Sequence, residues 1–199
     1  MSVTKEMIVE VSINILNSDG EESLSMRTIA QGLNIKAAAL YWHFKGKLEL
    51  YGAIAEHLCS QITMPDESFD PQEYLLTVQR EYRMALLSVR DSVVIFENSI
   101  PNTPVRIGII RRIADKLLQM GVVKENIMTI SNMLNNYVLS FTADEMRFKN
   151  SPPELKKTFT EMLDPEDKFI FINDRDFDEQ FEYGLQVLFM GLKALDDLG

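Results

Sequence analysis

Apolar residues recur at intervals of three and four along almost the whole chain, and no segment alternates for long at the two-residue period of a strand. One segment has an inward face made of Leu75, Val78, Tyr82, Leu86 and Val89. The last segment repeats the pattern with Phe181, Leu185, Leu188, Leu192 and Leu195. Because this spacing gathers apolar side chains on one side of a helix, the sequence predicts an all-α fold.

Capping residues and helix-breaking residues divide this pattern into separate helices. Ser25 and Asp70 are side-chain acceptors that suit a helix start, and Pro71 followed by Glu73 extends the second signal to a capping box. Gly20 suits the left-handed position that follows a helix. The expected helices cover residues 5–19, 25–33, 36–43, 47–62, 71–89, 92–99, 105–120, 124–149, 154–163 and 177–198.

The chain is acidic, but its excess of acid is not spread evenly. Its 199 residues carry a formal net charge of -10, and the sequence pI is about 4.7. Residues 1–47 hold five Lys or Arg and five Asp or Glu, so the whole deficit lies beyond them. Together with the helix pattern, this division predicts a small domain at 1–47 and a larger helical domain at 48–199.

Composition argues against several classes of protein. No apolar run approaches the roughly 18 residues that a membrane span needs, and the N-terminus lacks the charged-then-apolar pattern of a secretion signal. Cys59 is the single cysteine, so no intramolecular disulfide can form. We therefore expect a cytoplasmic protein that has no membrane partner.

The stretch from Ser23 to Lys47 contains no acidic residue. Its basic residues are Arg27, Lys36, Lys45 and Lys47. Ala30 is small enough for two helices to cross, and Asn34, four residues later, tolerates the left-handed backbone of a tight turn. These features predict a helix-turn-helix, although an ordinary helical hairpin has the same spacing.

The run from Leu40 to Lys47, Leu-Tyr-Trp-His-Phe-Lys-Gly-Lys, resembles the tetracycline repressor (TetR) family of bacterial transcriptional regulators, as does the helix around Arg27–Ala30. The resemblance covers residues 5–60. Residues 82–91 and 181–192 are more weakly similar to the core of the tetracycline-repressor subgroup. The resemblance implies an N-terminal three-helix helix-turn-helix DNA-binding head and a C-terminal helical bundle for ligand binding and dimerisation.

The resemblance also places residues 36–43 in the major groove of a double-stranded DNA operator. The implied DNA-binding residues are Arg27, Lys36, Ala37, Ala38, Ala39, Tyr41, Trp42, His43 and Lys47. Trp42 is open between DNA contact and an ordinary core position. Ala37–Ala39 departs from the usual pattern because alanine cannot hydrogen-bond a base. We expect few direct hydrogen bonds to bases, so Arg27 and DNA shape should supply most of the discrimination.

The last predicted helix has a second stripe beside the leucine-rich one. Its residues are Phe177, Gly184, Gly191 and Leu198, with Val187 and Ala194 flanking them. Two apolar stripes on one helix indicate two packing partners. Helix-turn-helix readers work as two-fold dimers with heads about 34 Å apart. We therefore expect a homodimer, and the resemblance implies that residues 124–149 share the interface.

The resemblance further implies an effector pocket in the core. Its candidate walls are Thr63, Val78, Tyr82, Phe96, Ser99, Ile113 and Met128. Phe96 stands where the tetracycline repressor holds a magnesium–drug chelate with a histidine; Thr63 and Val78 replace another histidine and an asparagine. A phenyl ring cannot ligate Mg²⁺, so we expect no metal, no cofactor and a small apolar effector. Asp144 is a candidate polar contact from the partner subunit, and a filled core is the alternative to a pocket.

These interpretations predict a ligand-responsive transcriptional regulator, by default a repressor that its effector releases from DNA. An enzyme is not expected, since His57 and Cys59 lie on different sides of a helix and no glycine-rich phosphate loop is present. The alternative is an all-helical ligand- or partner-binding protein that has lost sequence-specific DNA recognition. The alanine run at 37–39 favours that alternative.

Overall fold

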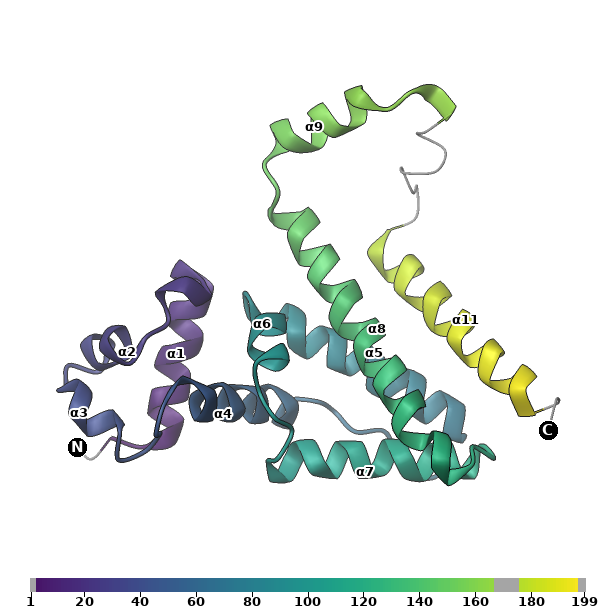
Figure 1. Cartoon of the computed structure of the whole chain (residues 1–199), viewed down its shortest axis with the longest axis horizontal. Coiled ribbons are helices and arrows are strands. Elements are labelled where there is room, and N and C mark those ends of the chain that lie inside the picture. Colours follow the sequence, from purple (N-terminus) through teal and green to yellow (C-terminus); the bar gives the residue numbers. More distant parts are fainter. Residues whose placement is uncertain (1–2, 167–175, 197–199) are drawn as a thin grey trace. The chain divides into compact units, whose positions relative to one another are not determined.

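The computed structural model describes residues 3–166 and 176–196, and all regular elements within those ranges are helices (Figure 1). In chain order they are α1 (Lys5–Asp19), the short η1 (Glu21–Ser23), α2 (Met26–Gly32), α3 (Ala37–Leu40), α4 (Lys47–Ser60), α5 (Pro71–Leu87), α6 (Ser92–Glu97), α7 (Pro104–Gln119), α8 (Lys124–Asn150), α9 (Pro153–Met162) and α11 (Phe177–Asp196). The all-α prediction is confirmed. Leu198, expected to end the last helix, lies outside the described residues.

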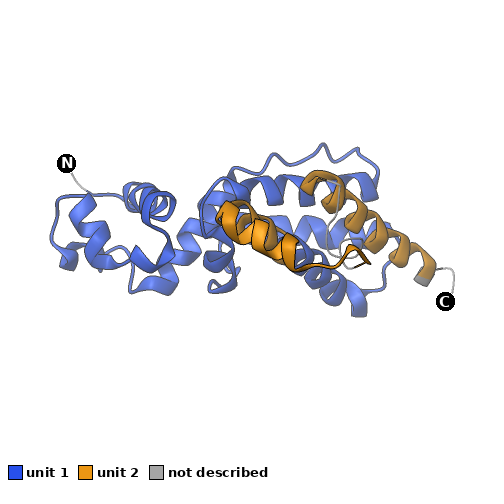
Figure 2. Ribbon diagram, turned by 90° about the horizontal axis from the view of Figure 1, so that it is seen from above, with its two compact units in different colours: residues 1–139 blue, residues 140–199 orange. Residues whose placement is uncertain are grey.

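The chain packs as two compact units, residues 1–139 and 140–199 (Figure 2). The division falls within α8, whose first half belongs to unit 1 and whose second half belongs to unit 2. Packing therefore divides the chain elsewhere than at residue 47, where we expect the functional boundary, and that boundary stays a prediction. None of the helices in the described ranges is long and apolar enough to cross a membrane.

The first three helices are fixed by the local signals that the sequence contains. Thr4 caps α1, and Ser25 forms a reciprocal capping box with Thr28 at the start of α2. Asn34 takes a φ of 54°, the left-handed value that the turn between α2 and α3 needs. Ala30 is buried, as a close approach of helices requires. These three helices form the head.

The regular part of α3 is shorter than predicted. It ends at Leu40, and residues 41–43 continue as a turn instead of a helix. The backbone tightens there, because His43 N–H donates to the Leu40 carbonyl at 2.9 Å, an interval of three residues. Phe44 N–H donates to the same carbonyl at 3.0 Å, and the Phe44 ring is buried. Anchoring Phe44 in the core of the head thus ends the helix early.

Beyond the head, α4 leads into the helices α5 to α8 of unit 1 and packs against α1 as well as α6 and α7 (Figure 1). Asp70 caps α5 by accepting from the N–H groups of Gln72 and Glu73. The predicted capping box is wrong in one respect: the Glu73 carboxylate pairs with Arg80 at 3.0 Å instead. The ion pair with Arg80, about two turns further along the same face of α5, takes the place of the reciprocal bond.

In unit 2, the second half of α8 packs with α11 through aromatic rings. The Phe141 ring lies 5.2 Å from that of Phe181 and 6.2 Å from that of Phe177. The buried stripe of α11 is Phe181, Leu185, Phe189 and Leu192. Leu188, predicted for this stripe, is only half-buried, and Phe189 takes the buried position.

Candidate functional site

The predicted reading surface of the head is exposed. Trp42 is 90% exposed and Tyr41 54%, so Trp42 is not a core aromatic. Arg27 and Lys36 are exposed as well, and neither has a carboxylate within ion-pair distance in residues 3–166 and 176–196. An exposed tryptophan in a head that also carries exposed, unpaired cations is typical of a binding surface rather than of a hydrophobic core.

The predicted helix positions differ from one another in exposure. Ala38 is exposed, Ala37 and Ala39 are half-buried, and His43 is half-buried. Only small methyl groups therefore stand along the outer side of α3. Such a surface can approach a groove closely, but it offers no side-chain donor or acceptor to a base edge.

Lys47, predicted to contact a phosphate, has an acidic partner within the protein. Its ammonium pairs with the carboxylate of Glu21 at 2.6 Å, and Tyr51 O–H donates to the same carboxylate. These two hydrogen bonds hold the pKa of Glu21 below its ordinary value. Lys47 therefore shares its charge with an acid of the head, and a phosphate would have to compete for it.

A set of polar contacts joins the head to the start of α6. The backbone N–H of Glu21 donates to the Asp91 carboxylate at 2.8 Å, and the backbone N–H of Arg90 donates to the Asn17 side chain at 2.9 Å. Gly20, with a φ of 82°, leaves no room for a side chain, since a Cβ there would lie 2.9 Å from Arg90 and Asp91 atoms. We call these five residues the head–core latch.

A second connection runs along α4. Leu50 and Tyr51 near its start are buried, and Cys59 near its end lines a cavity in the core. Between them, the Glu56 carboxylate accepts from the backbone N–H groups of Val105 and Arg106 at 2.9 and 3.2 Å. Glu56 thereby caps the N-terminus of α7 from a neighbouring helix, a favourable place for a negative charge.

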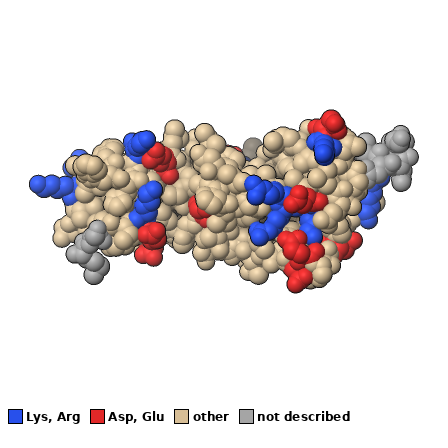
Figure 3. All heavy atoms as spheres, turned by 90° about the horizontal axis from the view of Figure 1, so that it is seen from below, with Lys and Arg blue, Asp and Glu red and all other residues tan. Residues whose placement is uncertain are grey.

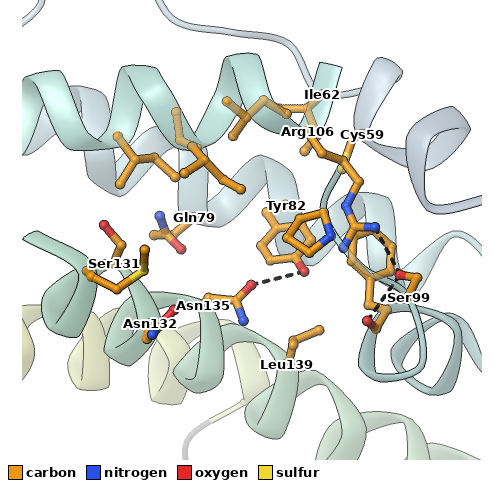
Figure 4. Close-up of a pocket in the computed structure, with 17 residues that line it drawn as sticks. Cys59, Ile62, Gln79, Tyr82, Ser99, Arg106, Ser131, Asn132, Asn135 and Leu139 are labelled. Carbon is orange, nitrogen blue, oxygen red and sulfur yellow. Dashed lines mark hydrogen bonds between the residues drawn. The ribbon is translucent and has the colours of Figure 1, made fainter. Parts of the chain in front are cut away.

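The cavity lies within unit 1 and has a volume of about 310 Å³ (Figure 4). It is lined by Cys59, Ile62, Val78, Gln79, Tyr82, Phe96, Ser99, Pro101, Arg106, Ile109, Ile110, Ile113, Met128, Ser131, Asn132, Asn135 and Leu139. The core is therefore open here and not filled. Of the predicted wall residues, all but Thr63 line it. Thr63 is exposed, and its N–H donates to the Glu81 carboxylate at 3.2 Å.

Arg106 is the charged member of the cavity lining. The residue is 7% exposed, and Nη1 donates to Ser99 Oγ at 2.9 Å and to the Ile100 carbonyl at 3.1 Å. Its guanidinium carbon lies 5.1 Å from the centre of the Phe96 ring. Burial lowers the pKa of Arg106, but a guanidinium in a protein still stays protonated at neutral pH.

Several neutral polar groups share the cavity with Arg106. Tyr82 O–H contacts Asn135 Oδ1 at 3.4 Å, and the buried Ser131 Oγ has no hydrogen-bond partner among the residues described (Figure 4). Burial raises the pKa of the Tyr82 hydroxyl and raises the pKa of the Cys59 thiol to about 12. Tyr82 and Cys59 are thus neutral at physiological pH and act as dipoles, not as charges.

Apart from Tyr82 and Ser99, the polar lining of the cavity was not predicted from the sequence. The missed polar residues are Cys59, Gln79, Arg106, Ser131, Asn132 and Asn135. A signal for Arg106 existed, because Ile109, Ile110 and Ile113 follow it by three, four and seven residues on the same helical face. Spacing alone does not tell whether such an arginine enters a cavity or extends past it to solvent.

In the described ranges, no three His, Cys, Asp or Glu residues lie close enough together to hold a metal ion. Asp144, a candidate contact from a partner subunit, pairs with Arg147 at 2.7 Å and is exposed. Figure 3 shows basic and acidic side chains intermixed on the visible face, without a continuous field of one sign. On this face, an interaction with a polyanion would depend on a local cluster of cations.

Two family models match the chain. Residues 8–54 match "Bacterial regulatory proteins, tetR family", and residues 64–195 match "Tetracyclin repressor-like, C-terminal domain". The tetracycline repressor protein class A from transposon 1721 of Escherichia coli is 31% identical over 100 residues, which cover 49% of this chain and 46% of the relative. The chain thus spans about half the length of the curated relatives that it matches.

Solved structures match over nearly the whole chain. BioQ with its double-stranded DNA operator has a TM-score of 0.72 at 27% identity, covering 96% of this chain and 99% of that one. A TetR variant from Acinetobacter baumannii AYE in complex with minocycline has a TM-score of 0.77 at 25% identity, covering 97% and 94%. One similar structure therefore holds DNA and another holds a drug.

Proposed function

Because this chain belongs to the tetR family of bacterial regulatory proteins, we propose that it is a ligand-responsive transcriptional repressor of the cytoplasm. It binds a palindromic operator as a homodimer, and a small effector releases it. One observation carries the proposal: α4 is a single helix that is packed in the head at one end and lines an open cavity at the other.

The DNA-binding surface of this proposal is the exposed side of α2 and α3. Arg27 reads a base from α2, while Lys36, Tyr41 and His43 position the phosphate backbone. Trp42, nearly fully exposed, contacts DNA beside them. The similar structure of BioQ with its operator supports this assignment. We assign these roles to residues 1–47 and the regulatory roles to residues 48–199.

Dimerisation is assigned to α11 together with α8. Tyr183, Val187 and Met190 of α11 are exposed apolar side chains, with exposed fractions of 56%, 51% and 71%. A Cβ added at Gly191 would meet no neighbouring atom within 4 Å, so another helix can approach there. A second copy of this chain would bury these groups and hold the two heads at the spacing of successive major grooves.

Ligand response is assigned to two connections between cavity and head. Glu56 on α4 caps α7 beside the cavity, and the head–core latch joins the start of α6, a helix that supplies Phe96, to the end of α1. An effector that prefers a different position of α6 or α7 shifts the population of head positions. A coupling of about 1–3 kcal/mol would change operator affinity about 5–150-fold.

Selection of bound duplexes from a random pool tests the proposal. We expect an enriched palindrome with half-sites one helical turn apart, and its binding should stay orders of magnitude above that of random duplex. An unenriched pool would instead favour the binding protein without sequence-specific DNA recognition that the alanine run suggests. A half-site without a palindrome would contradict the homodimer.

A further inference from the structure

The buried guanidinium of Arg106 has hydrogen-bonding capacity that the described residues do not use. Nη1 makes two hydrogen bonds, to Ser99 and Ile100, while Nε and Nη2 make none with the described residues. No carboxylate of those residues lies within ion-pair distance of it. A guanidinium has five N–H donors in a planar fork that suits two oxygens of one anion.

The acid that acts on this charge through space, Glu56, forms no ion pair with it. Glu56 uses one carboxylate oxygen for the N–H of Val105 and the other for the N–H of Arg106, so both oxygens are engaged at the backbone. A buried cation without a paired anion is costly, and the cost falls when an anion binds beside it. Binding of a negatively charged group is therefore favoured at the end of the cavity where Arg106 lies.

The rest of the lining limits what else the ligand carries. Arg106 is the charged residue among the 17 that line the cavity. The rings of Phe96 and Tyr82, 5.4 Å apart, and isoleucines of α7 form apolar walls. Ser131 Oγ adds one unpartnered hydroxyl on α8. Such walls suit a single negative charge on a largely apolar body and disfavour a polyanion such as a nucleotide.

We propose that the effector is a small amphipathic organic anion, a compact apolar or aromatic body whose carboxylate, phenolate or sulfonate group is bound by Arg106. The inference rests on the proposed function, and it adds one charged group to the small apolar effector that the sequence suggested. The apolar expectation holds for the walls of the cavity and is extended at Arg106, which no pattern of apolar residues could show.

A matched pair of fluorescent probes tests the proposal on the full chain without DNA. Anilinonaphthalenesulfonate is an aromatic anion, and N-phenylnaphthylamine is the same ring system without the sulfonate. Because hydrogen bonds to a charged group are worth more than neutral ones, the unmodified protein should bind the anion about 10- to 100-fold more tightly. Equal affinities for the two probes overturn the proposal without any variant.

Substitutions test whether Arg106 causes the preference for the anionic probe. Arg106→Met should bind both probes with similar affinity, and Arg106→Lys should keep part of the preference. Arg111→Met, which removes an exposed arginine of the same helix, should leave the preference unchanged. Unchanged binding of the neutral probe to Arg106→Met shows that the cavity is intact. A preference for the anion that survives in this variant contradicts the assignment to Arg106.

The outcomes separate this inference from the proposed function. Enrichment of a palindrome together with equal probe affinities leaves the repressor standing with an uncharged effector. A preference for the anion that depends on Arg106, together with an unenriched duplex pool, leaves an anion-binding protein that does not read DNA.

Discussion

The head and the cavity both present cations to an anion, but in opposite surroundings. Arg27 and Lys36 are exposed and solvated, whereas Arg106 is buried against Phe96 and hydrogen-bonded to Ser99. An exposed cation gains affinity for DNA mainly by releasing counterions, so its effect depends on salt. A buried cation has already lost its water, and it gains affinity from direct hydrogen bonds that salt screens little.

The salt dependence of binding should differ between the head and the cavity, and this is the largest effect that we expect. A protein that contacts 6–10 phosphates loses about 10³- to 10⁵-fold in DNA affinity between 50 and 200 mM salt. We expect a loss of this order for the selected operator, measured by fluorescence anisotropy. Binding of anilinonaphthalenesulfonate in the cavity should change only slightly over the same range. A steep salt dependence of probe binding would show that the probe lies on the exposed cations and not at Arg106.

The thiol of Cys59 reports whether water fills the cavity. Burial raises its pKa to about 12, and only the thiolate reacts with alkylating reagents. At pH 8 the reaction with iodoacetamide should therefore be about 10³-fold slower than in the urea-unfolded chain, where the pKa is near its usual value of about 8.5. The rate should rise with pH towards 12. Mass spectrometry of the alkylated fraction gives both rates, and equal rates would mean a solvated cavity.

The dimer prediction states that two heads, each with low affinity for a half-site, bind the operator tightly when they are joined. Val187→Glu places a charge in the exposed apolar stripe of α11, where a second copy would bury it. We expect a monomer by light scattering at micromolar concentration and a loss of operator affinity of about 100-fold or more, since bivalent binding supplies that factor. Phe69→Glu, a charge on another exposed apolar residue between α4 and α5, should change neither measurement. A monomer that still binds the operator at full affinity would contradict the proposed role of the dimer.

A substitution of Arg27 tests whether this exposed side chain reads a base or only contacts the phosphate backbone. Arg27→Ala should relax the preference at one base position by about 1–3 kcal/mol and leave the other positions unchanged. Lys36→Ala should instead weaken binding to all sequences and lower the salt slope by about one. Duplex arrays that vary each position measure both effects. Equal weakening on every sequence would make Arg27 a phosphate contact.

The head could be predicted from the sequence because its signals are local. Ser25 caps within three residues, and Asn34 supplies its own left-handed turn. The end of α3 was less predictable, since it depends on burying Phe44, a tertiary contact that overrides helical spacing. The burial of Phe44 could not be predicted from the local spacing of residues.

The cavity was predicted only in part, and the division has a physical basis. Val78, Tyr82 and Phe96 stand at positions that the family resemblance supplies, and they do line the cavity. Thr63 does not, because the chain beyond α4 carries it to the surface. Arg106 was missed since its partners come from residues 96–100 and from α4, and spacing within α7 cannot reveal contacts between elements.

Breaking the ion pair of Glu21 and Lys47, which are 26 positions apart in the sequence, should give the smallest change in operator affinity. It tests whether a paired cation of the head behaves differently from the unpaired ones. Glu21→Gln removes the acid that occupies Lys47, so the ammonium becomes available to a phosphate. Operator affinity at low salt should rise a few-fold, because one more phosphate contact is made and one nearby negative charge is lost. The stability cost is small, as about 0–1 kcal/mol is usual for such partly exposed pairs.

Glu22→Gln is the matched control, since it changes the net charge equally at an exposed neighbour with no ion pair within the described ranges. If Glu22→Gln tightens binding as much as Glu21→Gln, the effect is long-range charge, and Lys47 does not touch the DNA. If only Glu21→Gln tightens binding, and Lys47→Ala removes the gain, then the Lys47 ammonium can contact DNA once it is no longer paired with Glu21. In that case the pairing of Lys47 with Glu21 tunes operator affinity, and the contrast with the unpaired Arg27 and Lys36 is a difference in function as well as in exposure.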